Sequence, residues 1–355
     1  MNVGIALPVT QPVPQPWHQT AGDVVATRWH RRRGSAKTAT RLQYGMNVSG
    51  IHHVTSMAGD PARAVRFYRE VLGLRLVKRT VNFDDPGTYH LYFGDSVGSP
   101  GTALTLFPYP DGRPGRAGAG QVTGTAFRVP EGSLDYWADR LDEHGVAREQ
   151  PVEAFGHRML GFEDADGLWY ELVAAGEAGD VDPWDGAVPA EHAIRGFFGV
   201  VLSLAEPGPT VEVLDRLGYE RTGEDGDRTR YRVPDGEPGA VVDLRTTDVG
   251  GRMGVGCVHH VAFRTPDDDA QSDWQATLRE HGHHVTEVKD RQYFRSIYFR
   301  EPGGVLFEIA TDGPGFTRDE TRESLGETLK LPPWLEEDGA AIEDALPALD
   351  VAVEQ

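Results

Sequence analysis

Two histidine pairs stand inside apolar segments that lie far apart in the chain. They occur in Ile51-His52-His53-Val54-Thr55 and in Val258-His259-His260-Val261-Ala262. A third apolar segment carries Glu308 between Phe307 and Ile309. A carboxylate is costly to bury in an apolar strand unless it is paired or bound to a metal ion. Because successive side chains of a strand point to opposite faces, one histidine of each pair could share a metal site with the acid.

Two neutral imidazoles and one carboxylate form the ligand set of non-haem iron oxygenases. Three protein ligands leave open positions on the ion, so a substrate with two adjacent oxygen donors could take two and dioxygen the third. A ring hydroxyl on such an ion loses its proton more easily, because the ion stabilises the oxyanion. These residue types therefore indicate a site that could couple an electron-rich ring to dioxygen.

The elements that must position these residues recur four times along the chain. Each copy begins with a short apolar strand, continues with an amphipathic helix that ends at a glycine, and closes with further strands. The helix-ending glycines are expected in the left-handed conformation of a helix C-terminus; they are Gly73, Gly145, Gly218 and Gly282. We therefore predict an α+β fold of four βαβββ modules, at residues 50–108, 122–174, 194–246 and 257–311.

The four modules are expected to form two domains, at residues 47–175 and 191–312. The segment between them, 176–190, has the Gly, Asp and Pro content of a linker. Residues 313–355 are expected to form a tail that packs over the second domain. Residues 1–46, with several prolines and a basic run, are expected to be a disordered leader, and Met46 is a candidate for the true start.

The repeat also selects among the candidate ligands. Aligning His260 with Gly124 places Glu308 on Glu171, because the two residues of each pair have nearly the same separation. Only the first and fourth modules carry a histidine in the first strand. If those two modules face each other, the metal ligands are His53, His260 and Glu308. The carboxylates without a histidine partner are expected to be structural or vestigial; they are Glu171 and Asp243.

Two stretches are similar to a known family, namely residues 50–55 and the run from Asp290 to Glu308, Asp-Arg-Gln-Tyr-Phe-Arg-Ser-Ile-Tyr-Phe-Arg-Glu-Pro-Gly-Gly-Val-Leu-Phe-Glu. The chain resembles the vicinal oxygen chelate superfamily, and within it the ring-cleaving dioxygenases of the hydroquinone and chlorohydroquinone type. The resemblance covers about residues 47–330. It implies one Fe(II) ion, with Mn(II) as the alternative, and as substrates a small aromatic diol and O2.

The resemblance also assigns residues around the metal. It implies that the substrate pocket is lined by His52, Thr55, His259, Arg291 and Tyr298. Tyr298 would hydrogen-bond a substrate oxygen and move a proton, while Arg291 and His259 would stabilise negative charge. One of the two histidines that precede the ligands would act as acid or base near neutral pH.

Composition narrows the class of partner. The chain has 35 basic and 55 acidic residues and a net charge of -20, which argues against nucleic acid or an anionic membrane surface. No segment has the roughly 20 consecutive apolar residues of a membrane span. The single cysteine, Cys257, excludes an intramolecular disulfide and suits a reducing compartment, so a cytoplasmic location is expected. Homo-oligomerisation stays open.

Two other functions are compatible with the same fold. A glyoxalase-type isomerase usually holds its metal with four protein ligands, but here the acid position of the first module falls near Thr105 or Leu106, which leaves the fourth ligand missing. A binding protein that sequesters a small molecule such as an antibiotic would need no metal triad. Thiol-dependent isomerisation without oxygen would favour the first alternative, and a metal-free native protein with an aromatic pocket the second.

Overall fold

The structure is a computed structural model that describes residues 47–176, 181–234, 236 and 239–349. The expected leader at residues 1–46 lies outside these residues, as do part of the expected linker and the end of the tail. Among the described residues, no helix is long and apolar enough to cross a membrane.

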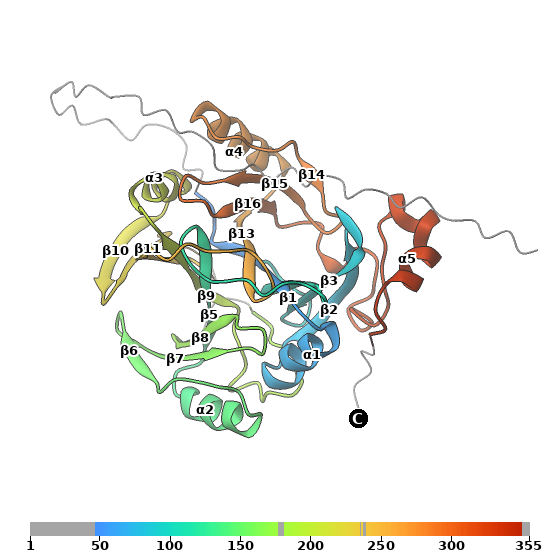
Figure 1. The fold of residues 1–355 in the computed structure, drawn as a ribbon, viewed down its shortest axis with the longest axis horizontal. Coiled ribbons are helices and arrows are strands. Elements are labelled where there is room, and N and C mark those ends of the chain that lie inside the picture. The colour runs from blue at the N-terminus through green and yellow to red at the C-terminus, as the bar shows by residue number, and fades with distance from the viewer. Residues whose placement is uncertain (1–46, 177–180, 235, 237–238, 350–355) are drawn as a thin grey trace, which may run out of the picture. The chain divides into compact units, whose positions relative to one another are not determined.

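Two eight-stranded mixed sheets form the framework (Figure 1). The first sheet combines strands from the first and fourth modules. In order across the sheet these are β14 (Lys289–Asp290), β15 (Arg295–Arg300), β16 (Leu306–Thr311), β13 (Cys257–Thr265), β1 (Ile51–Ala58), β4 (Ala103–Pro108), β3 (Asp85–Gly94) and β2 (Arg75–Asn82).

The second sheet combines the second and third modules in the same way. Its order is β10 (Glu220–Asp225), β11 (Arg228–Arg232), β12 (Val241–Thr246), β9 (Phe197–Leu204), β5 (Gln121–Val129), β8 (Trp169–Ala174), β7 (His157–Glu163) and β6 (Val152–Ala154). The α+β class and the four modules expected from the repeat are therefore confirmed.

The strand pairing differs from the expected division into consecutive domains, 47–175 and 191–312. The first strand of the first module pairs antiparallel with that of the fourth, and the first strand of the second with that of the third. The first and second modules meet instead where the helical segment of the first module packs against the second: the Tyr68 hydroxyl donates to Asp164 at 2.9 Å and shares a hydrogen bond with Tyr170. Register between strands, not order along the chain, decides which modules share a sheet.

Each module contributes one helix, and all of these helices end as expected. The helices are α1 (Pro61–Arg66) with its π-helical continuation η1 (Phe67–Val71), α2 (Leu134–Glu143), α3 (Gly208–Leu217) and α4 (Asp268–Glu280). The four glycines that follow them have φ between 67° and 94°, a region that strongly favours glycine. The main core includes buried residues from all four modules, among them Val54, Phe127, Val200 and Val261.

The tail contains η2 (Phe316–Arg318), η3 (Pro333–Asp338) and α5 (Gly339–Ala345). It contacts the fourth module, where the Tyr293 hydroxyl donates to Asp319 at 3.0 Å, and it also lies against the first module, which we had not expected. The buried Lys78 of β2 pairs with Asp319 and Glu320, and Tyr89 of β3 donates to the Pro347 carbonyl at 3.0 Å. These polar side chains of β2 and β3, which the sequence does not mark as tail partners, explain the contact with the first module.

Candidate metal centre

The central strands of the first sheet bring the three predicted ligands to one face. In the register between β1 and β13, His53 lies opposite Ala262 and Thr55 lies opposite His260. In the register between β13 and β16, Ala262 lies beside Glu308. Side chains opposite each other in a ladder share a face, so the two histidines and the acid must project together.

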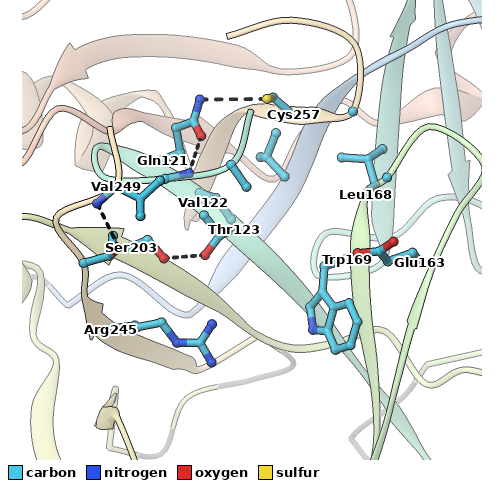
Figure 2. Close-up of a pocket in the computed structure, with 16 residues that line it drawn as sticks. Gln121, Val122, Thr123, Glu163, Leu168, Trp169, Ser203, Arg245, Val249 and Cys257 are labelled. Carbon is cyan, nitrogen blue, oxygen red and sulfur yellow. Dashed lines mark hydrogen bonds between the residues drawn. The ribbon is translucent and has the colours of Figure 1, made fainter. Parts of the chain in front are cut away.

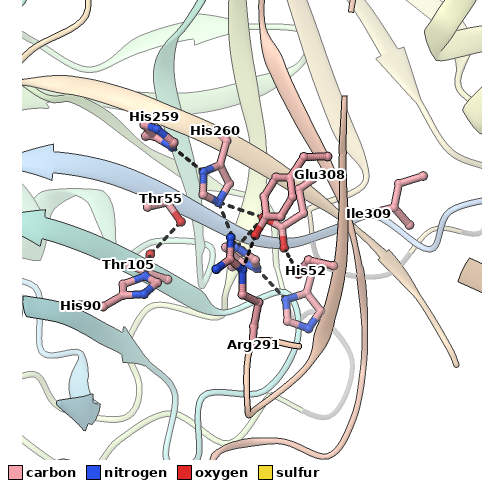
Figure 3. Close-up of polar contacts among 12 residues, drawn as sticks. His52, Thr55, His90, Thr105, His259, His260, Arg291, Glu308 and Ile309 are labelled. Atoms are coloured by element: carbon pink, nitrogen blue, oxygen red, sulfur yellow. Dashed lines mark hydrogen bonds and ion pairs between the residues drawn. The ribbon is translucent and has the colours of Figure 1, made fainter. Parts of the chain in front are cut away.

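The ligand atoms converge within 4.8 Å of one another (Figure 3). The Glu308 Oε2 atom lies 2.9 Å from Nε2 of His260 and 3.3 Å from Nε2 of His53, and the two Nε2 atoms are 3.3 Å apart. All three side chains are buried, Glu308 completely. The structure thus brings together the expected triad from modules more than 200 residues apart along the chain.

Two β-bulges place the neighbouring histidines beside the triad. The register slips between Ile51 and His53, and again on β13 between the residues opposite Thr55 and Ser56, so His52 and His259 are each the extra residue of a bulge. Their side chains then reach the ligands: Nδ1 of His52 is 2.9 Å from Nδ1 of His53. The matching distance between His259 and His260 is 2.7 Å. Strict strand alternation had predicted that only one histidine of each pair would face the cavity directly.

These contacts orient the ligand imidazoles. When Nδ1 of His53 and of His260 carries the ring proton, it donates to the preceding histidine, and Nε2 keeps a free lone pair. Burial, together with the nearby His260, lowers the pKa of His259 to about 3, so His259 is a neutral partner near neutral pH. Burial also places the pKa of His52 well below its usual value.

Glu308 has one oxygen engaged and one directed at the histidines. Its Oε1 accepts a hydrogen bond from Ser296 of β15, whereas Oε2 has no hydrogen-bond partner among the described residues. Burial opposes the carboxylate charge, but the two histidines hold the pKa of Glu308 well below its usual range. A buried unpartnered oxygen facing two imidazole nitrogens is the donor set that a divalent cation requires, so these residues fit a metal ion.

Arg291 and Tyr298 lie on the β15 side of the triad, where Tyr298 pairs in register with Glu308. The Arg291 Nε atom donates to the Tyr298 hydroxyl at 3.1 Å, and its Nη2 donates to Asp84 at 2.8 Å. Burial opposes the Arg291 charge, but Tyr298 and Asp84 raise the pKa of the guanidinium above its usual value. Asp290, the acid next to Arg291 in the sequence, accepts from the Gln292 backbone instead. Asp84, which holds the arginine, was not found from the sequence.

The opposite wall contains the expected Thr55 together with polar residues that were not among the sequence-predicted candidates. Thr55 lies beside Thr105 of β4, and their hydroxyls are 2.7 Å apart. His90 of β3 reaches Thr105 with Nε2 at 2.9 Å, and its Nδ1 lies 2.8 Å from the Tyr92 hydroxyl. The repeat could have pointed to Tyr92, because it lies opposite Thr105 as Tyr298 lies opposite Glu308.

The same strand register identifies the residue of the first module that is equivalent to Glu308 of the fourth. Thr55 pairs with Thr105 as Ala262 pairs with Glu308, so this position holds Thr105 and not Leu106. Its hydroxyl is already engaged by Thr55 and His90. A fourth carboxylate ligand, as in the isomerase alternative, is therefore missing from this position.

The second sheet carries an equivalent position without the metal ligands. Glu171 and Asp243 occupy the acid sites, but arginines fill the space between them: Arg228 pairs with Glu171, and Arg230 donates to both oxygens of Asp243 at 2.8 Å. The histidine positions hold Gly124 and Gly199. A Cβ on Gly199 would lie 2.3 Å from the Val241 carbonyl oxygen, so no histidine fits there. The expectation of a structural role for these acids agrees with this ion cluster.

A separate cavity of about 360 Å³ opens where the second sheet meets β13 (Figure 2). Its wall includes Trp169, Arg245, Ser203 and Cys257, and none of the triad residues. Cys257 belongs to this cavity, where its thiol lies 3.8 Å from the Gln121 amide nitrogen, and it does not belong to the metal centre.

Known proteins place this arrangement in a family. The sequence pattern of the Glyoxalase/Bleomycin resistance protein/Dioxygenase superfamily matches residues 50–172 and 195–309. The chain belongs to this superfamily. It is 48% identical over 305 residues to MhqO of Bacillus subtilis (strain 168), which carries the name of a ring-cleaving dioxygenase; the match covers 85% of this chain and 97% of MhqO.

Two further comparisons agree. The chlorohydroquinone/hydroquinone 1,2-dioxygenase of Sphingobium indicum is 36% identical over 306 residues, which cover 83% of this chain and 95% of that protein. A crystal structure from Bacillus subtilis subsp. subtilis str. 168, described as that of a dioxygenase, superimposes with a TM-score of 0.83 at 46% identity and covers 87% of this chain and 99% of its own. The resemblance expected from the sequence is thus confirmed, and the chain is an enzyme of the oxygenase class.

Proposed function

We propose that this protein is an Fe(II)-dependent, extradiol-type dioxygenase that opens the aromatic ring of a hydroquinone-like diol with O2. The observation that carries the proposal is the convergence of two imidazole Nε2 atoms on an unpartnered, buried carboxylate oxygen. The 36% identity to a chlorohydroquinone/hydroquinone dioxygenase supports the choice of substrate class.

In this proposal His53, His260 and Glu308 hold the ion. A bound Fe(II) ion would supply open positions for substrate oxygens and dioxygen, and a path for electrons from the substrate to dioxygen. The chain itself orients the ring and manages charge. Tyr298 donates a hydrogen bond to a substrate oxygen, and the fixed charge of Arg291 stabilises negative charge that develops nearby.

The remaining residues of the site bind and position the substrate. His52 and His259 are neutral and orient the two ligand histidines, and His259 can accept or return a proton at its second nitrogen. Thr55 contributes a hydroxyl on the same face as His53. The rings of Phe294 and Phe107 supply apolar walls, with centroids 4.9 Å from His53 and 5.7 Å from His259 respectively. These groups suit an aromatic diol as the substrate. We also propose that the enzyme is cytoplasmic, because its single cysteine suits a reducing compartment.

Oxygen consumption tests this function directly. Protein purified without oxygen and loaded with Fe(II), or in parallel with Mn(II), is offered hydroquinone, chlorohydroquinone and catechol in turn. We expect oxygen uptake that matches substrate loss, together with a new ring-opened absorbance, most strongly with the hydroquinones. No uptake with one bound metal ion per chain, accompanied by conversion of a hemithioacetal, would point to the isomerase instead.

A variant pair makes the test specific to the triad. His260→Ala should abolish both metal binding and oxygen uptake, because two ligands do not hold the ion. His281→Ala removes an exposed histidine after α4 and should change neither. Full uptake by His260→Ala would refute the proposed site.

A further inference from the structure

One wall of the metal site carries a continuous chain of side-chain hydrogen bonds. It runs from the Tyr92 hydroxyl to His90 at 2.8 Å, from His90 to Thr105 at 2.9 Å, and from Thr105 to Thr55 at 2.7 Å. Three adjacent strands, β3, β4 and β1, present these residues in register on the face that bears the triad. The chain therefore ends at Thr55, which lies opposite His260.

The direction of this chain follows from counting protons. Tyr92 is 1% exposed, and among the described residues its hydroxyl has no hydrogen-bond partner besides His90. If it accepted from His90, its own proton would be buried without an acceptor, which is unfavourable. The phenol therefore donates to Nδ1, which places the ring proton of a neutral His90 on Nε2.

The remaining steps follow in the same direction. With its proton on Nε2, His90 donates to the Thr105 oxygen, and Thr105 must then give its single proton to Thr55. Thr55 accepts that bond and keeps its own proton for another acceptor. Thr55, which lies beside His53 and His260, is thus the only member of this series of hydrogen bonds whose donor is unused.

The surroundings of His90 keep it neutral and in place. Burial sets its pKa well below the usual value, and the nearby His53 and His260 lower it further. Its ring packs between Tyr92 and Phe107, with centroid distances of 4.0 and 4.3 Å. A protonated imidazole would have no acceptor at Nδ1 and would break the direction of the chain.

We propose that His90, fixed by Tyr92, is a positioning residue that sets the Thr55 hydroxyl as a hydrogen-bond donor to an ionised phenolic oxygen of the substrate. This inference rests on the proposed dioxygenase function. A donor fixed before the substrate arrives stabilises a phenolate more than a neutral phenol. The wall would thus favour substrate in its ionised form, while the Arg291 and Tyr298 wall faces it from the other side of the triad.

A double-mutant cycle separates this role from a general structural one. Thr55→Val and Tyr92→Phe should each lower kcat by about 10–100-fold, the loss expected for one hydrogen bond to a charged group, at unchanged iron content. The double variant should be no slower than Thr55→Val alone, because Tyr92 acts through Thr55. Thr55→Ser should restore activity. Tyr89→Phe removes a hydroxyl from the same strand that contacts only the tail carbonyl of Pro347 among the described residues, and should leave kcat unchanged.

A binding measurement without oxygen tests the role of His90 separately from the dioxygenase function. Nitrohydroquinone, whose absorbance reports its ionisation, is titrated with pH on the Fe(II) protein. We expect the bound phenol to ionise at higher pH in Tyr92→Phe and Thr55→Val than in the unmodified protein. Equal ionisation in all three, or additive losses of kcat in the double variant, would overturn the role of His90. Failure of the unmodified protein to bind the probe or consume oxygen would instead count against the dioxygenase function.

Discussion

The triad differs from an ordinary buried ion pair because its three facing atoms can all be lone-pair acceptors. The Glu308 Oε2 atom faces two Nε2 atoms whose rings can place their protons on Nδ1, toward His52 and His259. In the second sheet, by contrast, the Glu171 oxygens face guanidinium donors. Buried acceptors that face only other acceptors repel one another, and a cation relieves that repulsion. The triad is therefore arranged for an ion, and the second cluster already contains its own cations.

At the same scale, Ser296 should matter for metal affinity although it is not a ligand. It donates to Oε1 of Glu308 and so keeps Oε2 directed at the histidines. Removing such an outer contact lowers metal affinity by about 10–100-fold. We expect Ser296→Ala to show this loss in a competitive Fe(II) titration, whereas Ser272→Ala, on the exposed face of α4, should not. Equal affinity in both variants would mean that the carboxylate needs no support from Ser296.

At the scale of the strand, the bulges show what the sequence could and could not predict. Local patterns predicted the strands, the helix-ending glycines and the ligand set, because each depends on nearby residues. Alternation alone did not predict the contacts of His52 and His259 with the ligand histidines, since a bulge is a register slip between two strands and leaves no mark in one of them. The second sheet slips at the equivalent residues Thr123 and Phe198, so the bulge belongs to the module itself.

The arginine cluster of the second sheet should stabilise the fold without affecting the metal. Arg228 is mostly buried and pairs with Glu171, whose pKa it holds below the usual range against the opposing effect of burial. Removing one partner of a buried pair leaves an uncompensated charge and costs about 3–5 kcal/mol. Arg228→Gln should therefore lower the free energy of unfolding by this amount in urea denaturation, at unchanged metal content.

Two further variants test that explanation. Glu171→Gln combined with Arg228→Gln should recover part of the loss, because the double variant no longer buries a lone carboxylate at this position. Arg221→Gln, which breaks an exposed pair with Glu224, should change stability little. A double variant less stable than Arg228→Gln would show that packing, not charge, dominates the cluster.

The contact between the first and second modules should give the stability a pH dependence. Burial raises the pKa of Asp164, which accepts from Tyr68, to about 6. Because the unfolded chain releases this proton near pH 4 and the folded chain near pH 6, the folded state binds more protons between these values, and stability falls as the pH rises. Thermal melts should show this loss between pH 4 and 6, relative to Asp164→Asn, which has no such proton to lose. Asp135→Asn, an exposed control, should keep the pH dependence of the unmodified protein.

At the scale of the whole molecule, the metal site exists only because non-consecutive modules pair. The repeat predicted four modules and suggested that the first and fourth carry the ligands. It did not predict their strand pairing, since the hydrogen bonds between β1 and β13 join residues about 200 positions apart and depend on which sheet edges meet. The contacts of the tail with Lys78 and Tyr89 were missed for the same reason, because they are equally long-range.

Because the modules are interleaved between the two sheets, we can predict how the protein behaves when it is divided into two fragments. Residues 46–176 contain His53, and residues 177–355 contain His260 and Glu308, while each fragment supplies half of both sheets. Either fragment alone lacks a complete ligand set and exposes the central strands of two sheets, which favours aggregation. We expect the two fragments, produced together, to associate and bind one Fe(II) ion per pair in a metal analysis after gel filtration. Fe(II) bound with full affinity by residues 177–355 alone would contradict the shared site, because His53 would then contribute nothing.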